Sequence, residues 1–233
     1  MKALLFLILL VDSIFPVHAE VLKLDYRGFT VWLDCEHRGA INFYQKLGHD
    51  TGDYSRDSAF HFDKAVKPEC QQKSTRTYGR DYDLGHQVSA NSMDSDIESI
   101  HETNFITNIL PQTKELNRGA WLQTEEIAQC YRAANDLEIY GGAIWDENST
   151  VYFKAHDVYA PSFFYKVIWF DKYAIAWLFP NSHDAVGHDD IDKYLASVAE
   201  IEFKIKRSIP VPDSLKNIKP LKSWALPKGC SLK

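Results

Sequence analysis

Three blocks decide how this 233-residue chain folds: Tyr82-Asp83-Leu84-Gly85-His86-Gln87, then Asn104-Phe105-Ile106-Thr107-Asn108-Ile109-Leu110-Pro111-Gln112, and then Leu116-Asn117-Arg118-Gly119-Ala120-Trp121. In the first block, Gly85 lets the backbone approach a neighbour closely, and His86 follows it near an acidic residue. A histidine whose pKa lies near neutrality is an obvious general base. Taken alone, however, a histidine is more often a structural residue than a catalyst.

The third block opens the best helix candidate, residues 115–136, which is rich in Ala, Leu, Gln and Glu and contains no proline. Asn117 lies near its start, where a side-chain oxygen can cap backbone N–H groups or bind a hard cation. Glu125 follows about 80° round a regular helix. An amide and a carboxylate so placed can hold a Mg²⁺ ion that keeps most of its waters. The plain alternatives are a helix cap for Asn117 and a solvent-facing residue for Glu125.

The order and spacing of these blocks resemble the DNA/RNA non-specific endonucleases, the ββα-metal nucleases whose signature contains D-R-G-H. The resemblance covers roughly residues 54–180 and extends more weakly to 200. The matching residues are 83–86, Asn104, Asn108, Pro111-Gln112 and the block 116–121; Arg56, Phe60 and Asp63 match an upstream R-x-x-x-F-x-x-D segment, and Gly141-Gly142 and 161–168 match further downstream.

This resemblance implies an α+β fold with a mixed, mainly antiparallel central sheet, flanking helices and a ββα-metal finger as the active site. It also implies an endonuclease that hydrolyses phosphodiester bonds in DNA and RNA and leaves 5′-phosphates. His86 would be the general base, with its imidazole oriented by the backbone carbonyl of Asn104. Asn108 would support the site through hydrogen bonds, and Arg56 would neutralise the scissile phosphate.

The same resemblance implies a metal cofactor, Mg²⁺ or alternatively Mn²⁺. Asn117 would be its direct protein ligand, and Glu125 would hold one of its waters. The ion would stabilise charge on a phosphate oxygen and on the 3′ leaving oxygen as the P–O bond breaks.

Two positions depart from the family pattern. Leu84 stands where the signature has arginine, and Gln129 stands where the family usually places a second arginine, four residues after Glu125. Neither side chain can give phosphate the charged, forked contact of a guanidinium. We therefore expect a displaced arginine to contact the substrate phosphate. The candidates are Arg132, about 20° from the helical face of Glu125, with Arg80 and Arg118 as rivals; a surface helix residue is the plain alternative for Arg132.

These departures keep other classes of function open. A degenerate member of the family would bind nucleic acid without cutting it, and a metallophosphodiesterase would act on small phosphodiesters. The presence of His86, Asn108, Asn117 and Glu125 together favours an active enzyme, because a binding protein would not need this base and these ligands together.

Composition excludes disordered and fibrous classes, because 45% of the residues are hydrophobic and 13% are aromatic. The net charge of −6 argues against non-specific attraction to a polyanion. The charge is uneven: residues 204–233 contain eight Lys or Arg against Asp213 alone. This basic C-terminal tail could be a solvated end of the chain or a surface that helps to hold a phosphate backbone. No linker divides residues 20–233, which predicts a single domain.

Residues 1–19 are expected to be a signal peptide. Lys2 precedes the apolar run 3–11, and Val17-His18-Ala19 fits a cleavage site. The cleaved protein would be secreted or periplasmic and free of the membrane. In an oxidising compartment the four cysteines should form two disulfides, for which we expect the pairs Cys35–Cys70 and Cys130–Cys230 among three possible connectivities.

The remaining hydrophobic pattern predicts strands and a second helix rather than a regular βαβ alternation. We expect a hairpin about Asp171-Lys172. The predicted strands are 22–33, 40–46, 137–144, 150–154, 163–170 and 173–179, and the predicted second helix is 190–204.

Overall fold

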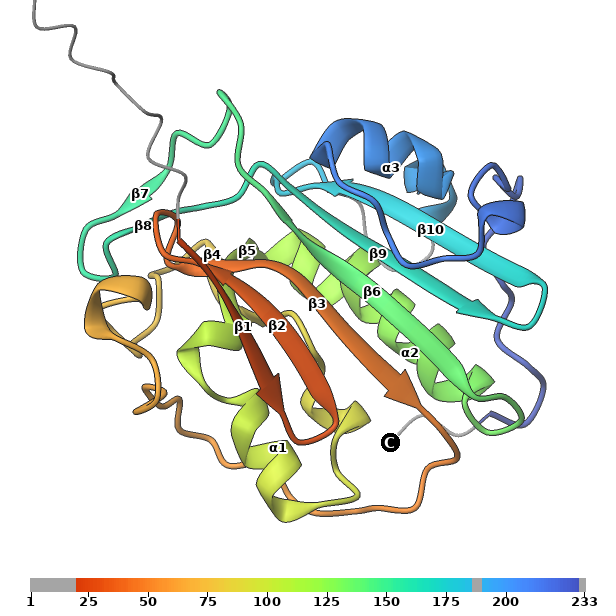
Figure 1. The fold of residues 1–233 in the computed structure, drawn as a ribbon, viewed down its shortest axis with the longest axis horizontal. Coiled ribbons are helices and arrows are strands. Elements are labelled where there is room, and N and C mark those ends of the chain that lie inside the picture. Colours follow the sequence, from red (N-terminus) through yellow and green to blue (C-terminus); the bar gives the residue numbers. More distant parts are fainter. Residues whose placement is uncertain (1–19, 186–189, 231–233) are drawn as a thin grey trace, which may run out of the picture.

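The computed structural model describes residues 20–185 and 190–230 (Figure 1). The expected signal peptide, residues 1–19, lies outside the described residues. A seven-stranded sheet runs through the molecule in the order β1-β2-β3-β6-β9-β10-β11, and all of its neighbouring strands are antiparallel. Its strands are β1 (Val21–Tyr26), β2 (Phe29–Asp34), β3 (Gly39–Leu47), β6 (Leu137–Ile144), β9 (Phe163–Phe170), β10 (Tyr173–Pro180) and β11 (Leu195–Ala196).

Each face of this sheet buries a separate hydrophobic core. In β9, Phe164 and Ile168 pack into the core shared with helix α2 (Trp121–Tyr131), whereas Tyr165 and Val167 pack into the core shared with helix α3 (Val198–Ile205). The alternation follows from the period of two in a strand. Two helices therefore cover opposite faces of one sheet, which is a three-layer α+β arrangement.

A smaller unit lies on the α2 side of the sheet. Strands β4 (Tyr82–His86) and β5 (Ile109–Thr113) pair antiparallel, with His86 opposite Ile109, and the chain then enters the π-helical turn η4 (Leu116–Ala120) and α2. Helix α1 (Ile97–Thr103) lies between β4 and β5 in sequence. The remaining short elements are β7 (Tyr152–Phe153), β8 (Val158–Tyr159) and the 3₁₀ turns Pro68–Cys70, Ala90–Ser92, Ile106–Asn108, Ile191–Tyr194 and Asp213–Leu215.

The predicted fold class and the hairpin about Asp171-Lys172 are confirmed, but several boundaries are wrong. The single strand expected over 22–33 is two strands that turn at Gly28, whose φ of 94° favours glycine. The helix expected from 190 starts only at Val198, because Ser197 caps it in a capping box with Glu200. The strand expected over 150–154 is only β7. Helix α1 was not predicted, although Asp96 caps its first turn.

Two disulfides join distant parts of the chain. Cys35–Cys70 links the residue after β2 to the first 3₁₀ turn, and Cys130–Cys230 ties the C-terminal segment to α2. Both expected pairings are confirmed. Among the described residues, no helix is both long and apolar enough to cross a membrane.

The basic C-terminal tail is partly neutralised by acidic side chains of the body. Lys216 lies 2.9 Å from Glu202, Lys219 lies 3.0 Å from Glu200, and Lys204 lies 3.6 Å from Asp146. The contacts of Lys216 and Lys219 dock the tail along α3, and with Lys204 three cations of the tail already have carboxylate partners.

Candidate active site

His86 stands at the end of β4, where close packing fixes the backbone. A Cβ on Gly85 would lie 2.3 Å from the side chain of Gln112 in β5, so this position in the first block needs glycine. The indole Nε1 of Trp121 donates to the carbonyl of His86 at 3.2 Å. The first residue of α2 therefore holds the histidine backbone from the other side.

The side chain of Asn104 orients the imidazole. Its Nδ2 donates to the carbonyls of Asp57 (2.6 Å) and Ala59 (3.1 Å), so its oxygen is the atom that faces Nε2 of His86 at 2.9 Å. An amide oxygen only accepts hydrogen bonds, so Nε2 carries the proton and Nδ1 keeps the lone pair. A general base needs such a lone pair.

The expectation that the backbone carbonyl of Asn104 orients His86 is wrong. That carbonyl instead accepts from the backbone N–H of His61 at 3.0 Å. Asn104 ends α1 as its C-cap, and this turn directs the backbone oxygen toward residue 61 and the side chain toward His86. Asn104 was therefore predicted correctly as the partner of His86, but the contact is made by its side-chain oxygen and not by its backbone oxygen.

The pKa of His86 is lowered to about 4. Burial is the main cause, the hydrogen bond to Asn104 opposes it, and the positive charge of Arg56 lowers the pKa further. The ring of Phe60 packs 5.6 Å from the imidazole, centroid to centroid. Around neutral pH the side chain is therefore an unprotonated base.

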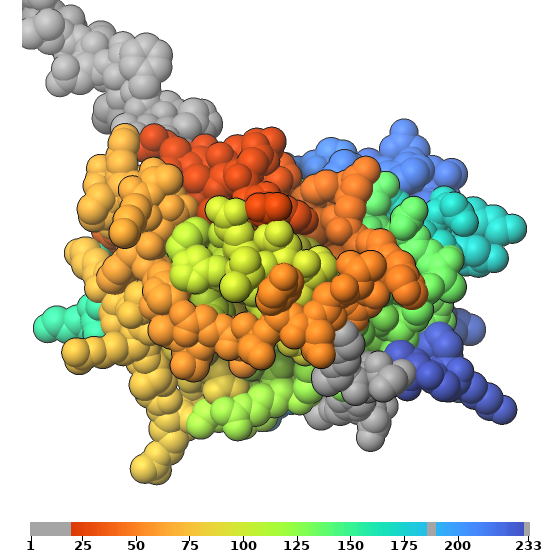
Figure 2. Space-filling model, turned by 90° about the horizontal axis from the view of Figure 1, so that it is seen from below, coloured from red at the N-terminus to blue at the C-terminus, as the bar shows by residue number. Residues whose placement is uncertain are grey.

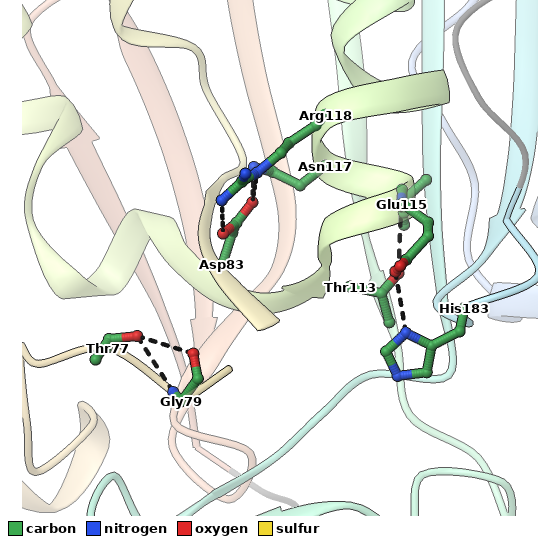
Figure 3. Close-up of polar contacts among 9 residues, drawn as sticks. Thr77, Gly79, Asp83, Thr113, Glu115, Asn117, Arg118 and His183 are labelled. Carbon is green, nitrogen blue, oxygen red and sulfur yellow. Dashed lines mark hydrogen bonds and ion pairs between the residues drawn. The ribbon is translucent and has the colours of Figure 1, made fainter. Parts of the chain in front are cut away.

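Asn117 is oriented by the acidic residue of the first block (Figure 3). Its Nδ2 donates to Oδ2 of Asp83 at 3.1 Å, and the guanidinium of Arg118 binds both carboxylate oxygens of Asp83 at 2.7 and 2.8 Å. Burial would raise the pKa of Asp83, but the hydrogen bonds from Arg118 and Asn117 outweigh it, so the pKa lies below its ordinary value. Because the amide nitrogen is engaged, the amide oxygen of Asn117 remains available as a ligand.

Glu125 shares the interior of the site with a buried lysine. Nζ of Lys166 lies 3.9 Å from the Glu125 carboxylate and 3.7 Å from the ring centroid of Trp121. Burial raises the pKa of Glu125, whereas it lowers the pKa of Lys166 to about 8. Lys166 comes from the centre of β9, and each group is the counter-ion that the other needs away from water.

A pocket of about 240 Å³ brings these side chains together. Four predicted site residues line it: Arg56, His86, Asn117 and Glu125. Arg118, named as a rival phosphate contact, also lines it, and its side chain is 65% exposed. The other lining residues are Ser89, Ala90, Asn91 and Leu122.

Of the described residues predicted for the site, three do not line this pocket. Asn108 is fully buried, and its amide joins Val88 to Thr103 through hydrogen bonds of 2.9 to 3.0 Å. These hydrogen bonds position the segment that follows His86, while the Asn108 side chain itself does not line the pocket. Arg80 is exposed outside the pocket lining.

The expectation that Arg132 contacts phosphate is wrong. This residue is only 4% exposed, and its guanidinium donates to the carbonyls of Gly48 (2.7 Å) and Ser92 (3.4 Å). The regular helix angle placed Arg132 near the face of Glu125, but at the end of α2 the Arg132 side chain packs against other segments of the chain. Gln129 likewise donates to Asp50 at 2.7 Å, and Leu84 packs into a small hydrophobic cluster.

The donor atoms fit a hard divalent cation. The free amide oxygen of Asn117 and the carboxylate oxygens of Glu125 border one pocket, and they are the oxygen ligands that Mg²⁺ takes in small number while it keeps water. The helical angle between the two residues is not the regular one expected, because η4 is π-helical and Gly119 has non-helical dihedrals (φ −112°, ψ −108°).

Lys166 was not predicted as a residue of the site. The strand Phe163–Phe170 alternates between two buried faces, and a lysine on the same face as Phe164 and Ile168 signals a buried charge that needs a partner. The contact by which Asp83 orients Asn117 was not predicted either, because these two residues meet only across the turn from β5 into α2.

A ββα unit on an antiparallel sheet, with histidine, asparagine and glutamate around one pocket, is the arrangement expected of a ββα-metal nuclease. The chain belongs to the DNA/RNA non-specific endonuclease family, whose profile matches residues 12–208. This family is in general metal-dependent. The fold is similar to a chain in the crystal structure of the EndoG/EndoGI complex, solved for the mechanism of EndoG inhibition, with a TM-score of 0.65 and 21% identity over 82% of this chain and 86% of that one. A search of the curated protein sequences finds no match to this chain.

Proposed function

We propose that this protein is an exported, Mg²⁺-dependent endonuclease that hydrolyses phosphodiester bonds in DNA and RNA to 5′-phosphate products, with little sequence preference. The observation that carries the proposal is the convergence of Arg56, His86, Asn117 and Glu125 on one pocket. A site that contacts phosphate and metal has no need of base edges, so low sequence preference follows.

His86 takes the proton from the attacking water at Nδ1, while Nε2–H remains hydrogen-bonded to Asn104. Asn117 would hold the metal directly through its amide oxygen, and Glu125 would hold it through a water molecule. Mg²⁺, or Mn²⁺ in its place, supplies positive charge beside the phosphate and the 3′ leaving oxygen when it is bound.

Cations of the chain bind the substrate phosphate. Arg56 lines the same pocket as His86, and its positive charge lowers the pKa of the imidazole, so we assign it to the scissile phosphate. Arg118 lines the same pocket and keeps most of its surface in solvent. We propose that Arg118 takes the place of the arginine that Leu84 replaces in the signature. Asp83 then fixes the guanidinium of Arg118 and the amide of Asn117 together.

Export is supported by two observations. The apolar run 3–11 and the residues before position 20 fit a signal peptide, and both cysteine pairs are disulfide-bonded. We infer a secreted or periplasmic enzyme whose mature chain is a single domain from residue 20 onward.

Digestion of plasmid DNA and of RNA tests this function. The purified protein should cut both with Mg²⁺, should cut neither with EDTA, and should regain activity when Mg²⁺ is returned. Products that a 5′-phosphate-dependent exonuclease degrades without prior kinase treatment would support the assigned cleavage direction. Nucleic-acid binding without metal-dependent cutting would identify a degenerate member of the family instead. Cutting of only small phosphodiesters would identify a metallophosphodiesterase.

A further inference from the structure

A second cluster of metal-ligating side chains lies outside the pocket, on the surface beside α1. One ligand atom each from Asp57, His61 and His101 lies within 4.8 Å of the other two. Nε2 of His61 lies 3.0 Å from Oδ2 of Asp57, and the two imidazole rings are 4.7 Å apart, centroid to centroid. His101 belongs to α1, whereas Asp57 and His61 belong to an earlier segment of the chain, so the cluster joins two segments. Figure 2 shows the yellow-green surface of the α1 region bordered by orange atoms of earlier residues.

The chemistry of this cluster differs from that of the nuclease pocket. Two imidazoles and one carboxylate are the donor set of Zn²⁺ and similar borderline divalent ions, which often keep water in a fourth position. Asn117 and Glu125 offer only oxygen, which suits Mg²⁺.

The cluster is also connected to the catalytic histidine. The carbonyl of Asp57 accepts from Nδ2 of Asn104 at 2.6 Å, and the N–H of His61 donates to the carbonyl of Asn104 at 3.0 Å. The oxygen of the same Asn104 side chain faces His86 at 2.9 Å. Two of the three candidate ligands therefore hold the residue that orients the general base.

We propose that Asp57, His61 and His101 bind one Zn²⁺-like ion, and that this ion fixes the segment 57–61 against α1 and so steadies the contact between Asn104 and His86. The binding is independent of the proposed nuclease function. Only the effect on His86 as a base rests on that function.

Calorimetric titration with Zn²⁺, in excess Mg²⁺ to occupy the nuclease pocket, tests the binding. The wild-type protein should bind one Zn²⁺, and His101→Ala should weaken it by about tenfold or more. His183→Ala is the matched control, because His183 lies 3.0 Å from Glu115 in a similar exposed pair (Figure 3) and should leave the affinity unchanged. Asp57→Asn keeps the shape of the side chain and should also weaken binding; thermal unfolding verifies that each variant is folded.

The connection to His86 is tested by NMR of the imidazole signals. Zn²⁺ should shift the His86 resonance in the wild-type protein and in His183→Ala, but not in His101→Ala. The proposal is overturned if the wild-type protein binds no Zn²⁺, or if folded His101→Ala binds it as tightly as wild type. An unmoved His86 resonance on saturation would overturn the connection. None of these measurements requires cleavage, so a protein without nuclease activity could still confirm the site.

Discussion

The side-chain oxygen of Asn104 lies 2.9 Å from Nε2 of His86, and it is held there because the amide nitrogen of Asn104 is bound to two backbone carbonyls. This contact fixes the tautomer of the imidazole and leaves Nδ1 as the basic atom. It joins residues 18 positions apart through α1, which lies between them in the chain.

Asn104→Ala should lower kcat by about a hundredfold with little change in KM, because the imidazole loses its orientation while the phosphate contacts remain. Steady-state cleavage of a defined oligonucleotide measures both constants. A hundredfold rise in KM with kcat unchanged would show that Asn104 acts on substrate binding and not on the base.

The pH profile of cleavage should reflect the low pKa of His86. The side chain is the active base when unprotonated, and its pKa is lowered from an ordinary 6.5 to about 4. Activity measured as kcat/KM should therefore persist well below pH 6.5 and fall only toward pH 4. An acidic limb centred at 6.5 would contradict the buried, neutral imidazole.

The same shift makes folding sensitive to acid. Between pH 6.5 and about 4 the unfolded chain binds a proton at His86 that the folded protein does not, so the free energy of unfolding should decrease as the pH falls through this window. Urea unfolding of the wild-type protein and of His86→Gln at several pH values measures this. The variant should lose less stability over the same window.

Asp83→Asn should weaken the response to metal. The substitution removes the charge that holds Arg118 and leaves Asn117 less well oriented, so the Mg²⁺ concentration for half-maximal cleavage should rise about tenfold or more. Titration of activity against Mg²⁺ measures this. Asn117→Ala should be more severe, and equal metal responses in the wild type and Asp83→Asn would refute the role of Asp83.

Substitution of Arg132 should lower stability with little effect on activity, and substitution of Arg56 should do the reverse. Arg132→Ala removes the guanidinium that donates to the carbonyls of Gly48 and Ser92. It should cost about 2 kcal/mol of unfolding free energy, with little effect on kcat at a temperature where the variant is folded. Arg56→Ala, at an exposed position, should reduce cleavage without altering stability. Denaturation and cleavage assays on both variants check the pair, and a reversed pattern would return Arg132 to the phosphate site.

The short, ordered blocks of the sequence were sufficient to predict four residues that line one pocket. The family motifs located His86, Asn117, Glu125 and Arg56, and the alternation of apolar residues located most strands of the central sheet. The disulfide pairs were also predicted correctly, as Cys130–Cys230 ties the C-terminal end to the body.

Contacts between distant segments could not be predicted in the same way. The pair Glu125–Lys166 spans α2 and β9, and Asn104 meets Asp57 across 47 residues. Helical periodicity placed Arg132 on a face but could not show that other segments cover that face. The angle assumed from Asn117 to Glu125 failed because the π-helical turn at Leu116–Ala120 interrupts the regular helix.

The central claim is that His86 is the general base of a metal-dependent nuclease. Its most direct test compares Mg²⁺-dependent cleavage of supercoiled plasmid by wild type, His86→Ala and the control His183→Ala, all verified as folded. We expect His86→Ala to lower kcat by about 100- to 10,000-fold, whereas His183→Ala should cut like wild type. Wild-type protein that does not cut in Mg²⁺, or His86→Ala that cuts at the wild-type rate, would contradict it.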